Sequence, residues 1–211
     1  MKPLADCRLY AFVDTAYLNG RAPGLVAKQL CGGGADLIQL RAKNSSRDEI
    51  RRMAEQILLI TRSANVGLVI NDHADIAREV GAELCHLGQE DFFDAGHKHT
   101  DEFKIQNSKF KIGLSSHAPD QAKRAIAADA DYIAIGPVYA TGTKPSAKPV
   151  TLEYVRWAAA NVKIPWFAIG GINLKNLNDV VAAGAKRICV VSAILNAPDV
   201  AKACAEFNER L

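Results

Sequence analysis

Two hydroxyl groups and one ammonium group lie within four residues of a loop that is rich in glycine and proline. Thr141, Thr143 and Lys144 follow the apolar run 132–135 in this loop. Hydroxyl groups donate hydrogen bonds to phosphate oxygens, and lysine supplies a positive charge. The loop therefore indicates phosphate binding, although a polar turn between two elements would have a similar composition.

A second polar cluster alternates with other residues at the end of an apolar run. Gln39, Arg41 and Lys43 are each separated by one residue, so in a strand they would face the same side. A guanidinium and an ammonium group that face the same way suit a diphosphate. The alternative is a solvated basic strand end.

Carboxylates follow the next two apolar runs. Asn71 and Asp72 come after one run, and Asp91 comes shortly after the other, which contains His86. Two carboxylates at neighbouring strand ends suit Mg²⁺, which also takes phosphate oxygens and waters. Asp72 could instead cap a helix that starts at His73. His86 is expected to pack inside the protein rather than to bind metal.

Ser115 and His117 follow a further apolar run, and a serine close to a histidine raises the question of a nucleophile. The sequence has no Gly-x-Ser-x-Gly motif, so we interpret Ser115 as a donor to phosphate. Two roles stay open for His117: an acid–base group, or a residue at the start of a helix before Pro119.

The last two apolar runs are followed by residues suited to a monophosphate. Gly170 and Gly171 would let backbone N–H groups approach an anion, and Ser192, after Val191, would open a final helix whose N-terminus favours negative charge. A tight turn is the alternative for the glycine pair.

The elements that position these residues alternate along the chain. Amphipathic segments of helical period separate short apolar runs, and runs that are apolar throughout indicate a parallel sheet covered by helices. The predicted strands are 9–13, 37–40, 67–70, 84–87, 112–114, 132–135, 166–169 and 188–191. The predicted helices include 47–61, 74–80, 121–128, 152–160 and 174–183.

An internal repeat specifies the architecture further. A small-residue turn precedes every second strand, and the alanines of these turns, at 35, 82, 130 and 185, are 47, 48 and 55 residues apart. Each period holds two strands and two helices, so four periods predict a (β/α)₈ TIM barrel of class α/β. We expect one domain over residues 1–211, with an open doubly wound sheet as the alternative. Residues 92–111 are expected to form an irregular surface segment.

Composition limits the function classes. The 211 residues are 49% hydrophobic and carry a net charge of +3, too little to indicate nucleic-acid binding. No apolar run approaches membrane-spanning length, and no signal peptide is visible. The five cysteines match no metal or redox spacing, which favours buried, reduced thiols in a cytoplasmic protein. Small molecules are the expected partners, and assembly into a homo-oligomer is left open.

In their order along the chain, these motifs resemble the thiamine phosphate synthase family over nearly the whole sequence. The matching stretches are residues 39–43, 71–72, 86–91, 113–115, 136–137, 141–144, 169–172 and 191–194. Members of this family are transferases of thiamine biosynthesis, use Mg²⁺ and have a TIM-barrel fold. It joins 4-amino-5-hydroxymethyl-2-methylpyrimidine diphosphate to hydroxyethylthiazole phosphate and releases pyrophosphate.

The resemblance implies a role for each matching residue. Gln39, Arg41, Lys43 and Asn71 would bind the pyrimidine diphosphate, Asp72 and Asp91 would bind Mg²⁺, Ser115 and Lys144 would hold the pyrophosphate, and Thr141, Thr143, Gly171, Val191 and Ser192 would bind the thiazole phosphate. Arg41, Ser115 and Lys144 are the expected catalytic residues. The sequence departs from the family at Ala42, where glutamate is usual, and at His73, where arginine is usual.

The implied mechanism is dissociative and needs no enzyme nucleophile. Mg²⁺ and the basic side chains would stabilise the departing pyrophosphate, and the electron-rich aminopyrimidine would support the methylene cation that forms. Three rival functions stay open. A thiazole tautomerase-like paralogue would use His117 as its acid–base group. A sugar-phosphate isomerase would explain only the monophosphate site. A catalytically silent sensor of phosphate ligands would bind without turnover.

Overall fold

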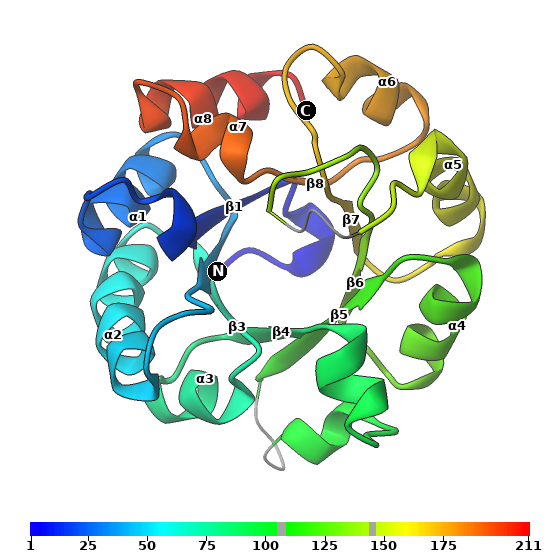
Figure 1. Cartoon of the computed structure of the whole chain (residues 1–211), viewed down its shortest axis with the longest axis horizontal. Coiled ribbons are helices and arrows are strands. Elements are labelled where there is room, and N and C mark those ends of the chain that lie inside the picture. Colours follow the sequence, from blue (N-terminus) through cyan, green and yellow to red (C-terminus); the bar gives the residue numbers. More distant parts are fainter. Residues whose placement is uncertain (105–108, 144–146) are drawn as a thin grey trace.

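The computed structural model describes residues 1–104, 109–143 and 147–211. Eight parallel strands close into a barrel in chain order, with β1 pairing both β2 and β8 (Figure 1). The strands are β1 (Leu9–Asp14), β2 (Leu37–Arg41), β3 (Gly67–Asn71), β4 (Leu84–Leu87), β5 (Lys111–Ser116), β6 (Tyr132–Ile135), β7 (Trp166–Ala168) and β8 (Ile188–Cys189). The predicted barrel is therefore confirmed, and the open sheet is excluded.

Helices form a ring around the strands (Figure 1). They are α1 (Pro23–Gly32), α2 (Arg47–Ser63), α3 (Ala74–Val80), α4 (Pro119–Ala127), α5 (Thr151–Asn161), α6 (Leu177–Ala182), α7 (Ser192–Leu195) and α8 (Val200–Glu209). Short helical turns add η1 (Leu4–Asp6), η2 (Thr15–Tyr17), η3 (Glu90–Asp94) and η4 (Thr100–Phe103). Within the described residues, β4 and β5 are joined through η3 and η4 rather than through an α-helix.

The small-residue turn predicted before every second strand is present in the structure. Gly34, Gly81, Asp129 and Gly184 each follow a helix with a positive φ, of 85°, 79°, 59° and 104°. A left-handed residue ends the helix and redirects the chain into the next strand. One backbone geometry therefore recurs at every second unit of the barrel.

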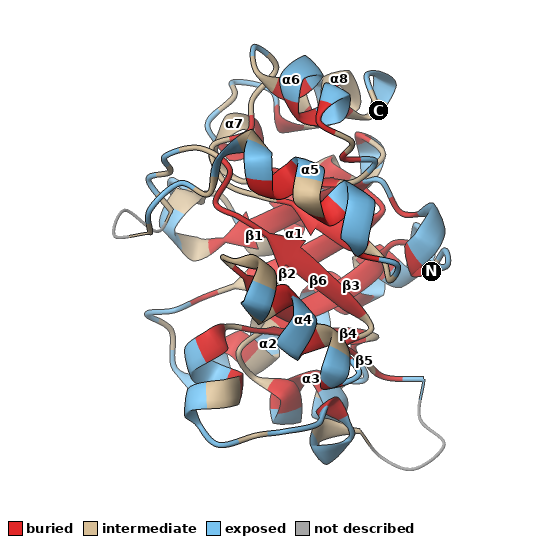
Figure 2. Ribbon diagram, turned by 90° about the vertical axis from the view of Figure 1, so that its right-hand side faces the viewer, coloured by how far each residue is buried: buried red, intermediate tan, exposed pale blue. Residues whose placement is uncertain are grey.

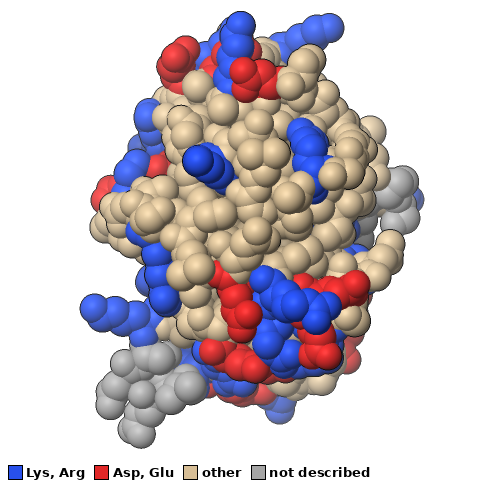
Figure 3. All heavy atoms as spheres, turned by 90° about the vertical axis from the view of Figure 1, so that its left-hand side faces the viewer, with Lys and Arg blue, Asp and Glu red and all other residues tan. Residues whose placement is uncertain are grey.

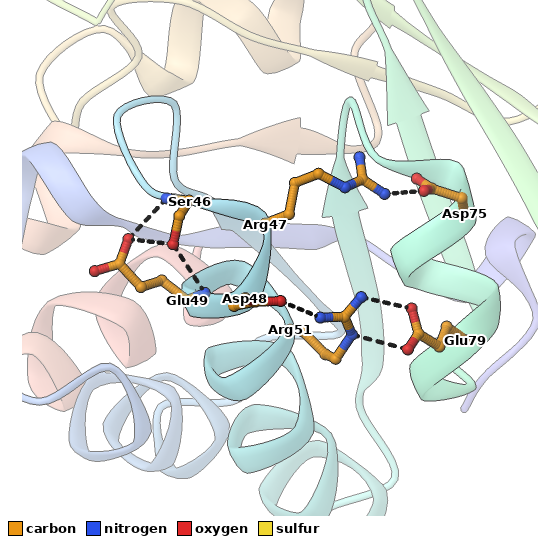
Figure 4. Close-up of polar contacts among 7 residues, drawn as sticks. All are labelled: Ser46, Arg47, Asp48, Glu49, Arg51, Asp75 and Glu79. Atoms are coloured by element: carbon orange, nitrogen blue, oxygen red, sulfur yellow. Dashed lines mark hydrogen bonds and ion pairs between the residues drawn. The ribbon is translucent and has the colours of Figure 1, made fainter.

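Helices α2 and α3 are joined at their outer faces by ion pairs. Arg51 pairs with Glu79 of α3 at 2.8 Å, and Arg47 pairs with Asp75 of α3; Arg51 also pairs with Asp48 within α2 at 2.6 Å (Figure 4). The start of α2 is fixed by a capping box, in which Glu49 Oε2 accepts from the Ser46 N–H at 2.7 Å. Figure 3 shows basic and acidic side chains gathered together on the face that carries these helices, so the charges there are mixed.

The apolar interior has two parts, one between strands and helices and one inside the barrel. Most strand residues are buried, whereas the helices of the outer ring carry many exposed residues (Figure 2). The inner part contains Tyr10, Phe12, Tyr132, Phe167 and Cys189, with Leu4 of η1 packed at the N-terminal side. Side chains thus fill the barrel towards the N-terminal ends of the strands, and space remains at their C-terminal ends.

The structure differs from the sequence predictions at residues 92–111 and in its set of helices. Residues 92–111 are not wholly a surface segment, because Phe92 in η3 is fully buried against Phe93 and Phe103. Helices α1 and α8 were not among the predicted helices. The five cysteines are free, and four of them are buried. Among the described residues, none of the helices is both long and apolar enough to cross a membrane.

Candidate active site

A cavity of about 400 Å³ opens at the C-terminal ends of the barrel strands. Its floor includes the aromatic residues Tyr10 and Phe12. Every predicted site residue that the structure describes lines it: Gln39, Arg41, Lys43, Asn71, Asp72, Asp91, Ser115, Thr141, Thr143, Gly171, Val191 and Ser192. Lys144 lies outside the described residues. The barrel therefore brings together side chains that are up to 153 positions apart in the sequence.

One side of the cavity carries the cations. Arg41 Nη1 donates to Asp14 Oδ2 at 2.8 Å, and Asp14 is only 1% exposed. Asp14 Oδ1 also accepts from the N–H of Ala16 at 3.0 Å, so both carboxylate oxygens are occupied. Lys43 Nζ lies 3.2 Å from Asp72 Oδ2. Arg41 and Lys43 are thus each held by a carboxylate from a neighbouring strand end.

The carboxylates Asp72 and Asp91 face each other across the ends of β3 and β4. Burial and the negative charge of Asp91 raise the pKa of Asp72, while Lys43 opposes this shift. Asn71 Nδ2 donates to Asp72 Oδ2 at 2.5 Å. Asp72 does not cap the following helix, because α3 begins at Ala74 after His73; Asp72 instead takes the left-handed conformation, with φ of 63°. The capping alternative is therefore wrong.

The described residues contain no cluster of three or more His, Cys, Asp or Glu that could hold a metal ion on its own. The pair Asp72 and Asp91 nevertheless fits Mg²⁺, which is commonly held by one or two carboxylates and completes its shell with substrate phosphates and water. Their mutual repulsion is the condition that a bound divalent cation would relieve.

Ser115 is fixed through both its backbone and its side chain. Its carbonyl accepts from Gln89 Nε2 at 2.6 Å, and Gln89 Oε1 in turn accepts from Arg124 Nη2 at 2.8 Å. Its Oγ lies 3.0 Å from Nε2 of His86. Burial lowers the pKa of His86 to about 4, so its imidazole is neutral near pH 7.

His117 lines the cavity but is not the partner of Ser115. Its Nδ1 contacts the carbonyl oxygen of Gly136, and its backbone N–H donates to Gln121 Oε1 at 2.7 Å. Helix α4 begins two residues later, at Pro119. The histidine beside Ser115 is therefore His86, for which the sequence indicates only packing inside the protein.

The opposite side of the cavity is built from glycine loops and hydroxyls. Gly171 has φ of 65°, and a Cβ there would lie 2.6 Å from the Ala140 carbonyl oxygen, so the two loops meet backbone to backbone. The N–H of Thr143 donates to Thr141 Oγ1 at 3.3 Å. Ser192 is the first residue of α7, a helix of four residues. This side offers donors without any carboxylate among the predicted residues.

Several residues that organise the cavity were missed from the sequence. Asp14 holds Arg41, and the Tyr17 hydroxyl lies 3.2 Å from Thr143 Oγ1. Tyr10 and Tyr132 link Gln39 to His86 inside the barrel. The sequence does contain a signal for Asp14. It directly follows the first apolar run, as Arg41 follows the second, and the two residues are paired in the register of β1 and β2.

Cations and paired carboxylates on one side, and glycine loops and hydroxyls on the other, define a (β/α)₈-barrel enzyme of phosphorylated small molecules. Residues 9–194 match the family model described as thiamine monophosphate synthase. The thiamine-phosphate synthase of Thermus thermophilus is 43% identical over 180 residues, which cover 85% of this chain and 84% of the relative. That of Acidothermus cellulolyticus is 42% identical over 210 residues, covering 99% and 96%.

The structure of thiamine phosphate pyrophosphorylase from Pyrococcus furiosus superposes with a TM-score of 0.86 at 30% identity, covering 99% of this chain and 96% of the other. The chain belongs to the thiamine monophosphate synthase family.

Proposed function

We propose that this protein joins 4-amino-5-hydroxymethyl-2-methylpyrimidine diphosphate to hydroxyethylthiazole phosphate, forming thiamine phosphate and pyrophosphate. The observation that carries the proposal is the division of one cavity into two differently charged sides. A diphosphate needs cations and a metal, whereas a monophosphate can be held by N–H groups and hydroxyls. Two phosphorylated substrates would thus meet between the two sides.

The pyrimidine diphosphate is assigned to the side formed by β2 to β5. Gln39 and Asn71 would contact the pyrimidine, and Arg41 and Lys43 would bind the diphosphate. Asp14, whose carboxylate is buried, holds the Arg41 guanidinium in place through an ion pair, which reduces the rearrangement needed when substrate binds. Lys144, which lies outside the described residues, would also bind the pyrophosphate, as the family resemblance implies.

Asp72 and Asp91 would hold Mg²⁺, which neutralises negative charge on the departing pyrophosphate when it is bound. Arg41, Lys43 and the Ser115 hydroxyl would stabilise the same charge with fixed donors. The apolar floor, which includes Phe12, Ala134 and Cys189, would keep water from the pyrimidine cation until the thiazole nitrogen attacks. None of these steps requires a covalent bond to the protein.

The thiazole phosphate is assigned to the side formed by β6 to β8. Thr141 and Thr143 would donate hydroxyl hydrogens, and the backbone N–H groups around Gly171 and Ser192 would complete the phosphate site, with Val191 beside the ring. We further propose a cytoplasmic location, in keeping with the five free thiols.

One assay tests the proposal directly. The purified protein is incubated with both substrates and MgCl₂, and thiamine phosphate and pyrophosphate are quantified by chromatography. Both products should form in equal amounts. A protein that binds both substrates but forms neither product would instead be a sensor or a tautomerase-like paralogue.

A further inference from the structure

A continuous line of hydrogen bonds crosses the interior of the barrel beneath the cavity. Gln39 Nε2 donates to the Tyr10 hydroxyl at 2.6 Å, and the hydroxyls of Tyr10 and Tyr132 lie 3.1 Å apart. The Tyr132 hydroxyl lies 3.1 Å from His86 Nδ1, and His86 Nε2 lies 3.0 Å from Ser115 Oγ. The line therefore runs from β2 through β1, β6 and β4 to β5.

The members of this line are shielded from solvent. Tyr132 is fully buried, and Tyr10, Gln39 and His86 are at most 8% exposed. Gly113 makes room for the Tyr132 ring, because a Cβ at this position would lie 2.0 Å from the ring. Buried hydroxyl and imidazole groups need their hydrogen-bond partners, since an unpaired donor in an apolar interior is costly. The need of each buried donor for an acceptor therefore decides which atom of each hydrogen bond carries the hydrogen.

The amide of Gln39 sets the direction of the line. Because Tyr10 accepts from Gln39, its own hydrogen needs an acceptor, and among the described contacts that acceptor is the Tyr132 oxygen. Tyr132 then donates to Nδ1 of His86, which makes Nδ1 the unprotonated nitrogen of the neutral ring. The hydrogen of His86 consequently sits on Nε2 and is donated to Ser115 Oγ. With the opposite direction, the Tyr10 hydrogen would have no acceptor among these contacts.

We propose that Gln39, Tyr10, Tyr132 and His86 act as positioning residues that fix the hydroxyl polarity of Ser115. Because Ser115 Oγ accepts from His86, its own hydrogen is free to be donated into the cavity. Ser115 is thereby set as a donor to an anionic oxygen, and its pairing with histidine does not activate it as a nucleophile. The assignment of that oxygen to the departing pyrophosphate rests on the proposed function; the direction of the line does not.

The direction is measured in the full-length protein labelled with ¹⁵N-histidine. Two-bond ¹H–¹⁵N correlation spectra distinguish a protonated from an unprotonated ring nitrogen, and comparison with His86→Gln assigns the His86 signals among the five histidines. We expect Nε2 of His86 to be protonated and Nδ1 to be unprotonated at pH 7.5. A proton on Nδ1, or an even mixture of the two tautomers, would overturn the proposal.

Kinetics test the consequence for Ser115. Tyr132→Phe removes only the hydroxyl and should lower kcat about 3- to 10-fold, the effect of one hydrogen bond. In a Ser115→Ala background the same change should have less than about a 2-fold effect, because its target is gone. Full additivity of the two changes would contradict the proposed coupling. Tyr10→Phe provides a second entry into the same cycle, with the same expectation.

Tyr154→Phe is the matched control. Its hydroxyl contacts Ser116, next in sequence to Ser115, and donates to the Ala118 carbonyl at 2.7 Å, outside the line. It should leave kcat unchanged, and a loss equal to that of Tyr132→Phe would show a general packing effect. If the unaltered protein makes no thiamine phosphate, the proposed function fails while the tautomer measurement still decides the direction.

Discussion

The carboxylate of Asp14 lies 2.8 Å from the Arg41 guanidinium at the paired ends of β1 and β2. Asp14 is 1% exposed, whereas the Arg41 side chain is 18% exposed and lines the cavity. The buried member therefore fixes the orientation of the member that reaches the cavity. In the proposed function, Arg41 would contact the diphosphate only in the direction that Asp14 allows.

Asp14→Asn should separate positioning from folding. The amide oxygen can still accept from the Ala16 N–H, but the amide NH₂ group would face the donors of Arg41. We expect kcat/KM to fall about 10- to 100-fold as Arg41 leaves its position. Asp36→Asn, at the opposite end of the barrel beside Lys2, should lose stability without this loss of activity. Steady-state kinetics and thermal unfolding of both variants decide the question, and an unchanged kcat/KM for Asp14→Asn would refute the positioning role.

Asp91→Asn should remove the response to magnesium. Mg²⁺ at a hundredfold excess over its Kd should stabilise the unaltered protein by about 2.7 kcal/mol, which corresponds to roughly 5–10 °C in Tm for a chain of this length. Asn relieves the repulsion with Asp72, so the variant in chelator should melt no lower than the unaltered protein. Thermal scans with EDTA and with MgCl₂ test both statements. Asp94→Asn, on the same short helix η3, should respond to magnesium normally; an Asp91→Asn protein that did the same would exclude Asp91 from the site.

The fold could be predicted because the strands, helices and turns of the barrel repeat a local sequence pattern. The turn before every second strand recurs with a positive φ, even where Asp129 replaces glycine. Helix α1 escaped prediction because its first turn contains Pro23 and Gly24, residues that read as a loop. Gly24 is nevertheless buried, and a Cβ there would lie 2.8 Å from Gln56 of α2. Its place in a helix is therefore decided by packing between helices, which the local pattern does not contain.

The cavity lining could be predicted because the carboxyl ends of parallel strands meet at one end of a barrel. The partners of these residues could not be predicted, because they depend on register. Asp14 meets Arg41, and His86 meets Ser115, only when two strands are aligned to the residue. The left-handed conformation of Asp72 likewise has no signal in the sequence, since Asp before a helix ordinarily indicates a cap.

The turn formed by residues 97–102 should become less stable in acid. The hydrogen bond to His97, with those from the N–H groups of His99 and Lys98, lowers the pKa of Glu102 to about 2. Because the folded pKa is below the ordinary value near 4.5, the ionised carboxylate stabilises the fold above pH 4.5, and this contribution is lost as the pH falls towards 2. Glu102→Gln should therefore have a lower urea midpoint at pH 7, and the difference should shrink at pH 3. The exposed Glu55 on α2 provides the control, since Glu55→Gln should show a smaller difference at pH 7.

Tyr17→Phe should weaken binding of the thiazole phosphate more than it slows the chemistry. The Tyr17 hydroxyl lies 3.2 Å from Thr143 Oγ1 and joins the segment after β1 to the loop after β6. Without it, Thr143 would have to be ordered by the substrate itself, so KM for the thiazole phosphate should rise about 3- to 10-fold with little change in kcat. Tyr139→Phe is the matched control in that loop, because its buried hydroxyl has no hydrogen-bond partner among the described residues. It should leave both constants unchanged and, by removing an unpaired polar atom, should not lower Tm. A fall in kcat for Tyr17→Phe at constant KM would place Tyr17 with the departing pyrophosphate instead.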